Sequence, residues 1–372
     1  MKPTVYLVAT HFWRRDGTTQ DIGGAQRYCK DVADLLVSWG YPCVVIQQAD
    51  LNFRKQLNER LSIIGVKGSS KILSQFWFSR TVKRYIEPGS PVIYINMQLA
   101  WPVTLHPCLT IQHGIWWDSD EMKTWEVRLQ GWMIKQIVGR CDDMICVDTN
   151  FMNWFRATWP HTDISTKLSY IPNYVDPQLF HLAPPKTGHD DVVVVYPRRL
   201  CLRRGAITLV RSIEPILARC PNVKFHFIGD GELEMPLKDY IREHGLQNVA
   251  EVYPLPPDRM QEAYERADIV VIPTLAGEGT SLSCLEAMYC GRPVIATTVG
   301  GLPNLVFHGY SGLLIGPNEQ ELTAAVIRLA SDPELRTHLA ANARKVAEEL
   351  TIDIWKERVG VKLRRLLDRV KE

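Results

Sequence analysis

The sequence predicts an α/β fold made of two doubly wound domains that face a cleft. Three observations support this prediction. The 372 residues exceed one typical hydrophobic core and suffice for two. Short apolar runs alternate with segments of helical periodicity in both halves, as in parallel sheets covered by helices on both faces. A glycine pair also follows the first apolar run, which is typical of a Rossmann-like opening.

The composition is that of an ordinary soluble globular protein. Hydrophobic residues make up 46% and charged residues 23%, and a net charge of +2 argues against a strongly electrostatic nucleic-acid binder. The nine cysteines have neither CxxC nor zinc-type spacing, so we expect no disulfide scaffold and a cytoplasmic, reducing compartment. The N-terminal apolar run is too short for a signal peptide or a membrane span.

The first elements follow from this apolar run. Residues 4–10 are expected to form a strand, and a polar loop leads from it to Gly23 and Gly24. Apolar residues at helical spacing then predict a helix that stops at Gly40, followed by a strand at 43–47. The two glycines would let the backbone approach a ligand closely, although a plain helix-entry turn is the more common explanation of such a pair.

The first half continues with the same alternation. We expect strands at 92–95, 109–112 and 144–148, with a helix over 119–139 between the last two. His113 directly follows the strand at 109–112, and the carboxyl end of such a strand faces the ligand crevice of an open α/β sheet. Most lone histidines are structural, so position alone is a modest signal.

Residues 51–90 differ from their surroundings because they are basic and aromatic. Eight lysines and arginines face only two glutamates there, with five phenylalanines, tyrosines and tryptophans interleaved. An amphipathic segment of this kind can lie on an anionic membrane surface or receive an anionic acceptor. A solvated basic helix packed by its aromatics is the more common alternative.

The second half repeats the strand and helix alternation. A helix over 353–371 with an apolar stripe would be the second of two C-terminal helices. The other expected elements are strands at 192–196, 223–228, 249–253, 269–274 and 293–298, and helices ending near 219, at 232–244 and at 258–267.

The stretch EGTSLSCLE, residues 278–286, lies between two apolar runs and organises the second half. Thr280 or Ser281 suits a helix N-cap, and the free backbone N–H groups of that helix start would attract a phosphate. Glu286 falls beside the apolar face, where an unpaired carboxylate is costly. It therefore needs a hydrogen-bonding partner, and ligand hydroxyls are suitable ones.

Four arginines follow the first strand of the second half. Arg199 and Arg204 are five residues apart, and guanidinium groups suit phosphate oxygens. A cluster at the carboxyl end of a strand indicates an anion site. We expect Arg198 and Arg203 to be solvated.

These motifs together resemble the retaining nucleotide-sugar glycosyltransferases of family 4, which have the GT-B architecture. The resemblance rests on the E-x7-E spacing of Glu278 and Glu286, the Gly-Gly-Leu-Pro at 300–303 and the segment IPNYVDPQLF at 171–180. That segment is similar to the family's link between domains, with Tyr174 in place of the common glycine. The resemblance covers nearly the whole chain.

The resemblance implies where the domains divide. An N-terminal, acceptor-side domain would span residues 1–173, and a nucleotide-sugar-binding domain would span residues 174–352. In the family the chain end crosses back, so helix 353–372 would pack on the first domain.

The resemblance also implies a role for each matched residue. Glu286 would bind ribose hydroxyls, Glu278 would hold the sugar and phosphates, and His113 would contact the sugar near its reacting carbon. The two arginines would stabilise the departing diphosphate. The implied catalytic set is His113, Glu278, Arg199 and Arg204, and the implied donor-binding set is Gly23, Gly24, Gly279, Thr280, Ser281, Leu282 and Glu286.

The implied reaction moves a sugar from a nucleoside-diphosphate sugar to the hydroxyl of a sugar, glycan or lipid-linked acceptor, with retention. No acid cluster has an evident metal role, so we expect no metal or other cofactor. Peripheral contact with the inner face of a membrane through residues 51–90 is compatible with this function. A GT-B-fold epimerase or phosphorylase and a non-catalytic nucleotide-sugar-binding protein are the alternatives.

Overall fold

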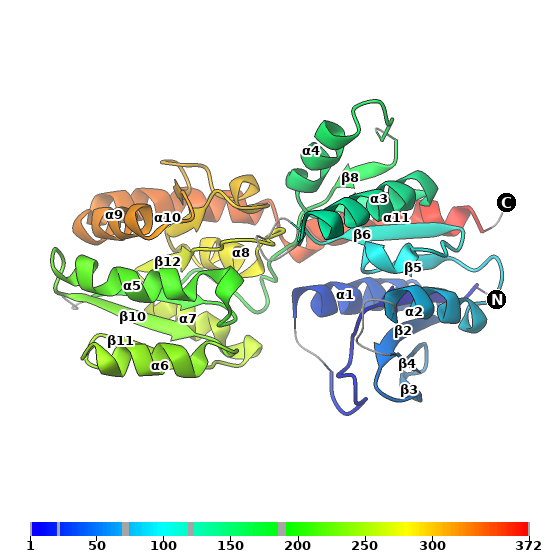
Figure 1. The fold of residues 1–372 in the computed structure, drawn as a ribbon, viewed down its shortest axis with the longest axis horizontal. Helices are drawn as coiled ribbons and strands as arrows, with labels where there is room; N and C mark the ends of the chain where they lie inside the picture. Colours follow the sequence, from blue (N-terminus) through cyan, green and yellow to red (C-terminus); the bar gives the residue numbers. More distant parts are fainter. Residues whose placement is uncertain are drawn as a thin grey trace. The chain divides into compact units, whose positions relative to one another are not determined.

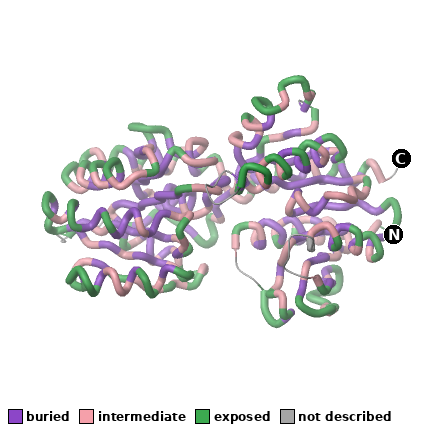
Figure 2. The backbone as a smooth tube through the Cα atoms, in the orientation of Figure 1, coloured by how far each residue is buried: buried purple, intermediate pink, exposed green. Residues whose placement is uncertain are grey.

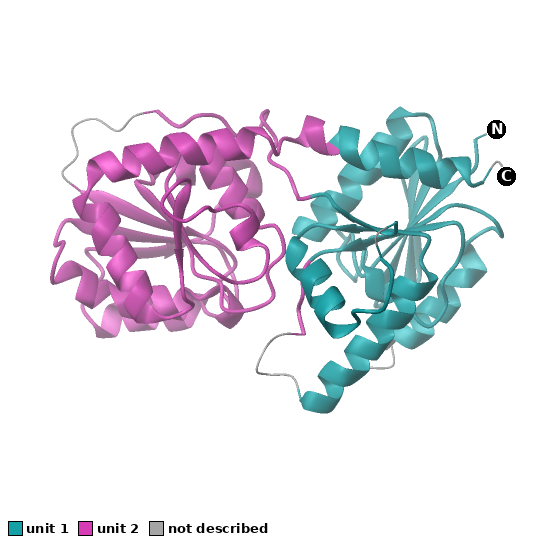
Figure 3. Cartoon of the chain, turned by 90° about the horizontal axis from the view of Figure 1, so that it is seen from above, with its two compact units in different colours: residues 1–113, 120–171, 356–372 teal, residues 114–119, 172–355 magenta. Residues whose placement is uncertain are grey.

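The computed structural model describes residues 2–20, 23–68, 74–117, 123–164, 166–184 and 191–370 (Figure 1). Strands and helices alternate along these ranges, and buried residues concentrate on the strands and on the inward sides of the helices (Figure 2). The chain divides into two compact units (Figure 3). The first unit comprises residues 1–113, 120–171 and 356–372, and the second comprises residues 114–119 and 172–355.

An eight-stranded sheet forms the centre of the first unit, in the order β3-β4-β2-β1-β5-β6-β7-β8. Every neighbouring pair is parallel except β3 and β4, which form an antiparallel hairpin at one edge. The strands are β1 (Val5–Ala9), β2 (Cys43–Ala49), β3 (Phe53–Asn58), β4 (Leu61–Lys67), β5 (Val92–Tyr94), β6 (Cys108–Gln112), β7 (Asp143–Cys146) and β8 (Leu168–Tyr170).

The helices of the first unit connect these strands. Gly40 adopts a φ of +81°, which allows the left-handed turn that follows the end of α1. The elements are α1 (Gly24–Ser38), α2 (Ser74–Val82), η1 (Lys83–Tyr85), η2 (Met97–Ala100), α3 (Thr124–Arg140), α4 (Thr149–Thr158) and most of the C-terminal helix α11 (Ile352–Asp368). The expected helix start at Ser119 and the last two residues of the chain lie outside the described residues.

Residues 51–90 are not one basic helix, the alternative that the sequence favoured. Their described residues form the β3–β4 hairpin, α2 and η1. β4 is buried because it lies between β2 and β3, and its apolar residues complete the sheet. Arg54 and Lys55 lie on the edge strand β3, where charged side chains discourage pairing with other chains.

A six-stranded parallel sheet forms the centre of the second unit, in the order β11-β10-β9-β12-β13-β14. The strand order reverses between β9 and β12, and the crevice outside the carboxyl ends at such a switch point is where open α/β sheets bind ligands. The strands are β9 (Val192–Pro197), β10 (Val223–Ile228), β11 (Ala250–Tyr253), β12 (Ile269–Ile272), β13 (Val294–Thr297) and β14 (Gly312–Ile315).

Helices cover both faces of this sheet. Val194 and Tyr196 of β9 belong to one hydrophobic cluster, whereas Val195 between them belongs to the other, as the alternation of side chains along a strand requires. The helices are α5 (Ala206–Leu217), α6 (Glu234–Glu243), α7 (Met260–Arg266), α8 (Leu282–Tyr289), α9 (Glu319–Ser331) and α10 (Pro333–Glu348). Three C-terminal helices, α9, α10 and α11, replace the two that were expected.

The predicted α/β class with two doubly wound units is confirmed by these two sheets. Within the described residues, no helix combines the length and the apolar character that crossing a bilayer requires. All nine cysteines are free thiols.

Candidate active site

The loops that leave the carboxyl ends of β9, β12 and β13 pack closely in the second unit. Gly205 has a φ of +76°, and a Cβ atom there would lie 1.8 Å from the carbonyl oxygen of Pro273. Gly300 has a φ of +59°, and a Cβ there would lie 2.0 Å from the carbonyl oxygen of Glu278. Only glycine allows these backbones to approach so closely. The close approaches fix the loop after β12 between its two neighbours.

Glu278 lies at the centre of this loop cluster and accepts three hydrogen bonds on one oxygen. Its Oε2 is 2.7 Å from Arg198 Nη1, 2.6 Å from Arg204 Nη1 and 2.8 Å from Thr274 Oγ1. Arg198 also donates to Thr274 Oγ1 at 2.5 Å. The Glu278 side chain is 6% exposed, so this carboxylate is an ion-paired group shielded from water.

The charges of this cluster determine its ionisation. Burial raises the pKa of Glu278, but the Arg198 and Arg204 guanidinium groups outweigh burial and hold that pKa below its ordinary value. Burial lowers the pKa of Arg204, partly opposed by the Glu278 carboxylate. Two arginines against one carboxylate leave one surplus positive charge in the cluster.

Three of the four arginines after β9 differ clearly in their environment. The expectation that Arg198 is solvated is wrong, because its side chain is 8% exposed and paired with Glu278. Arg204 is less buried, with 28% of its side chain exposed. Arg199 is exposed, and no ion pair to its side chain occurs within the described parts of the chain. The charge at this strand end was predictable, but which arginine faces inward depends on the turn.

The residues that precede α8 are held by backbone and side-chain contacts. Ser281 is the N-cap, as the sequence allowed, and its hydroxyl accepts a hydrogen bond from the N–H of Cys284. Asn173 Nδ2 donates to the carbonyl oxygen of Thr280 at 2.8 Å. Gly114 lies against Gly279, since a Cβ on Gly114 would be 2.7 Å from the Gly279 nitrogen. The N-terminal end of α8, including the half-buried first residue Leu282, is therefore held in place from two separate segments.

Glu286 lies on α8 and is 6% exposed. The Tyr264 hydroxyl donates to its Oε2 at 2.7 Å. Burial, followed by the Glu286 charge, raises the pKa of Tyr264 well above its ordinary value, so the phenol keeps its proton. Tyr264 supplies the partner that the sequence required but did not identify.

In the first unit, the glycine turn starts α1 and His113 contacts the same helix. Gly23 is the N-cap of α1 and Gly24 its first residue. Tyr28, one turn further along α1, makes an edge contact with the His113 ring at a centroid distance of 5.1 Å. His113 Nε2 is shielded from solvent and has no hydrogen-bond partner among the described residues. Burial lowers the pKa of His113 to about 4, so the imidazole is neutral near pH 7.

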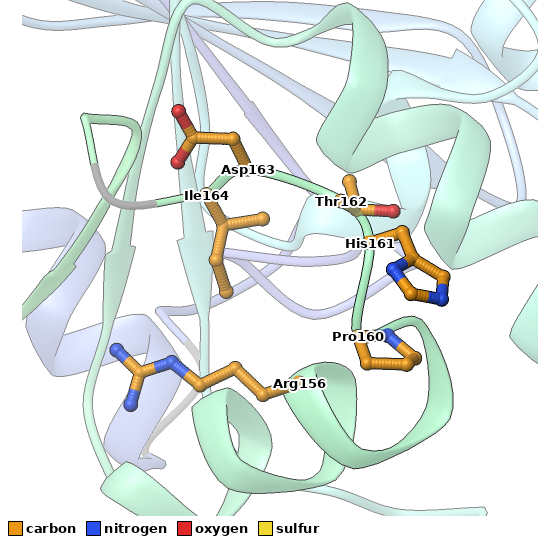
Figure 4. Close-up of a pocket in the computed structure, with 6 residues that line it drawn as sticks. All are labelled: Arg156, Pro160, His161, Thr162, Asp163 and Ile164. Carbon is orange, nitrogen blue, oxygen red and sulfur yellow. The ribbon is translucent and has the colours of Figure 1, made fainter.

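Two other features of the first unit include none of the predicted site residues. His106, Cys108 and Asp142 place their ligand atoms within 4.8 Å of one another near the amino ends of β6 and β7, opposite to the edge that carries His113. A pocket of about 360 Å³ lies beside the end of α4 (Figure 4). It is lined by Arg156, Pro160, His161, Thr162, Asp163 and Ile164.

The second unit is similar in sequence to known glycosyltransferases. Residues 181–346 match the family model described as glycosyl transferases group 1. An uncharacterized glycosyltransferase of Methanocaldococcus jannaschii is 32% identical over 46% of this chain and 45% of its own length. A D-inositol 3-phosphate glycosyltransferase of Saccharomonospora viridis is 33% identical over 45% of this chain and 43% of its own length. The chain thus spans less than half of the length of these curated relatives.

Solved structures show the same fold over nearly the whole chain. The sucrose-phosphate synthase of Thermosynechococcus elongatus has a TM-score of 0.82 at 18% identity and covers 99% of this chain and 100% of its own. The Anabaena protein HepE, solved with UDP-glucose, has a TM-score of 0.72 at 18% identity over 98% of this chain and 100% of its own. The fold is GT-B, and together with the family match it supports a GT-B glycosyltransferase.

Proposed function

We propose that this chain is a family 4-like retaining glycosyltransferase that moves a sugar from a nucleoside-diphosphate sugar to an acceptor hydroxyl without a metal ion. One observation carries the proposal. Glu278, paired with Arg198 and Arg204, lies beside the β9/β12 switch point of a group 1 glycosyltransferase domain. A switch point is where α/β sheets bind ligands, and a paired carboxylate surrounded by surplus positive charge suits a sugar diphosphate.

The arginines have different roles in this proposal. Arg198 contacts Glu278 and Thr274 through Nη1 and is only 8% exposed, so it positions the carboxylate. Arg204 and Arg199 are the more exposed pair, and Arg204 keeps 28% of its side chain exposed although its Nη1 contacts Glu278. Their guanidinium groups would stabilise the charge that builds on the diphosphate as it leaves. The backbone N–H groups of residues 279–282 would bind phosphate oxygens at the start of α8.

The remaining assignments follow the chemistry of each side chain. Glu286 would accept hydrogen bonds from ribose hydroxyls while Tyr264 holds its Oε2. The neutral imidazole of His113 would hydrogen-bond the sugar through Nε2. This atom has no hydrogen-bond partner among the described residues. The Gly23–Gly24 turn would let the backbone approach the donor diphosphate. The acceptor would be a sugar, a glycan or a lipid-linked sugar.

We favour a front-face displacement with an oxocarbenium-like transition state, in which the leaving phosphate accepts the proton of the acceptor. The alternative is a double displacement with Glu278 as nucleophile. Three donors within 2.8 Å of Glu278 Oε2 reduce the nucleophilicity of that oxygen, which favours the front-face mechanism. Trapping a covalent glycosyl group on Glu278 would rule out the front-face mechanism.

Thermal unfolding against UDP-, GDP-, ADP- and dTDP-linked sugars, in excess chelator, tests the donor site. UDP is the first candidate because solved neighbours with this fold include complexes with UDP and UDP-glucose. We expect one diphosphate to raise the melting temperature, and we expect Glu286→Gln to weaken that shift while Glu243→Gln, on the exposed end of α6, leaves it unchanged. No shift with any nucleotide would contradict the donor assignment.

Turnover then separates the proposal from its alternatives. A transferase consumes the donor only when an acceptor is present, and the product keeps the anomeric configuration of the donor. An epimerase would consume the nucleotide sugar without acceptor, and a phosphorylase would require free phosphate. Loss of transfer in excess chelator would contradict the metal-independent mechanism.

A further inference from the structure

The exposed side of α3 is apolar and basic. Five exposed residues of α3 recur at helical spacing: Trp125, Arg128, Leu129, Trp132 and Lys135. The two tryptophans are 57% and 51% exposed and the leucine 43%. The buried residues of α3 lie on its opposite side, so this outer side is not the one that the core covers.

This outer side continues onto α2 through a row of ring contacts. Trp77 on α2 is 60% exposed and lies 5.6 Å from the ring of Phe76. Phe76 lies 5.8 Å from the Trp101 ring, which in turn lies 6.0 Å from the Trp132 ring on α3. The tryptophan surface, as we name it, consists of Phe76, Trp77, Trp101, Trp125, Leu129 and Trp132. Phe76 and Trp101 are half-buried and join the exposed side chains, and a contiguous apolar surface that reaches solvent marks a site of interaction.

The two helices that carry the tryptophan surface are basic, and the Arg80 guanidinium lies 4.4 Å from the centroid of the Phe76 ring. Over residues 74–85 and 124–140 there are six bases and one acid, an excess of five, although the whole chain carries only +2. The one acid, Glu126, accepts a hydrogen bond from the N–H of Lys123 as part of the α3 N-terminal cap. The six bases are Arg80, Lys83, Arg84, Arg128, Lys135 and Arg140.

We propose that the tryptophan surface docks this protein on an anionic lipid bilayer. Indole rings partition to the boundary between headgroups and acyl chains, and the lysines and arginines of the same helices attract anionic headgroups. The excess of positive charge in these two segments complements a negatively charged partner. The surface differs from the segment 51–90 that the sequence indicated, because it includes α3 and excludes the β3–β4 hairpin.

The docking goes beyond the proposed transfer reaction and can be tested without any sugar donor. We would float the full chain with phosphatidylcholine vesicles and with vesicles that also contain phosphatidylglycerol. Salt would be about 0.1 M or about 1 M, between which the Debye length falls from roughly 10 to roughly 3 Å. We expect binding to the anionic vesicles at low salt and much weaker binding to neutral vesicles or at high salt.

Two variants and two controls locate the contact. The triple variant Arg80→Gln/Lys83→Gln/Arg84→Gln should bind anionic vesicles roughly 100-fold more weakly, because each base contributes a factor of roughly five. Trp77→Ser/Trp132→Ser should weaken it by roughly tenfold or more for each ring removed. Met235→Ser and Arg242→Gln replace equally exposed residues on α6 and should bind as the unaltered chain does. Circular dichroism and thermal unfolding would establish that all variants fold.

Several outcomes would overturn the proposal. One is that the unaltered chain fails to float with anionic vesicles at low salt. Another is equal binding to both vesicle types at both salt concentrations. Equal losses in the α6 controls and the tryptophan variant would also contradict it. A lipid-independent dimer that Trp77→Ser/Trp132→Ser abolishes would identify a second copy of the chain as the partner instead.

Discussion

Arg198 Nη1 lies 2.7 Å from Glu278 Oε2, and the two side chains are only 8% and 6% exposed. Arg204 reaches the same oxygen from a position with 28% exposure. The two arginines therefore differ in burial and in the role that we assign to them. Arg198 is a buried counter-ion of Glu278, whereas Arg204 retains a solvent-facing side that can meet a ligand.

Replacing Arg198 should lower stability, whereas replacing its neighbour should not. Arg198→Met leaves the buried Glu278 with one fewer counter-ion, which typically costs about 3–5 kcal/mol in the free energy of unfolding. Arg199→Met at the exposed position should change that free energy by less than about 0.5 kcal/mol. Urea unfolding of both variants measures the contrast. Equal stability of the two variants would contradict the structural role of Arg198.

Removing Arg204 should slow the transfer reaction. Arg204→Ala deletes a preorganised positive charge at the leaving diphosphate, which elsewhere costs roughly 10²–10³-fold in kcat. Arg204→Lys retains the charge and should recover part of the rate. Steady-state kinetics at saturating donor measure the effect, once the thermal-shift panel has identified the donor. Unchanged turnover in Arg204→Ala would remove this residue from the catalytic set.

The sequence predicted the sheets better than the pairing inside the loops. Strands such as Ile269–Ile272 were predictable because a buried parallel strand is a continuous apolar run bounded by turn residues. The short elements α4, β8 and β14 were not predicted, and the hairpin of β3 and β4 was mistaken because its edge strand is polar. Short or exposed strands have weak periodicity, so composition dominated the interpretation there.

The candidate site shows the same limit. Ser281 was predictable as an N-cap because capping depends on local sequence. Arg198 pairs with Glu278, which is 80 positions away in the sequence. Tyr264 contacts Glu286, which is 22 positions away. No pattern within one loop encodes such pairs. A buried carboxylate did indicate that partners exist, but only the packed loops reveal which ones.

The stability of the fold should fall in acid because of Glu278. Its carboxyl has a lowered pKa in the folded chain, so the unfolded chain binds a proton more readily. The stabilisation is present above about pH 4.3, the ordinary glutamate pKa, and is lost as pH falls through the folded value. The difference in unfolding free energy between the unaltered chain and Glu278→Gln should therefore shrink below about pH 4.3. Glu243→Gln, at an exposed position, should show no such convergence.

His113 should produce a second pH effect in a separate range. Burial lowers its pKa to about 4 in the folded chain, whereas an unfolded histidine titrates near pH 6.5. Because the unfolded chain takes up this proton first, stability should decline as pH falls from about 6.5 towards about 4. His113→Asn should remove that part of the decline, and His161→Asn, at an exposed position, should not. Urea unfolding across this range measures both variants, and an unchanged slope in His113→Asn would show that His113 is protonated in the folded chain at an ordinary pH.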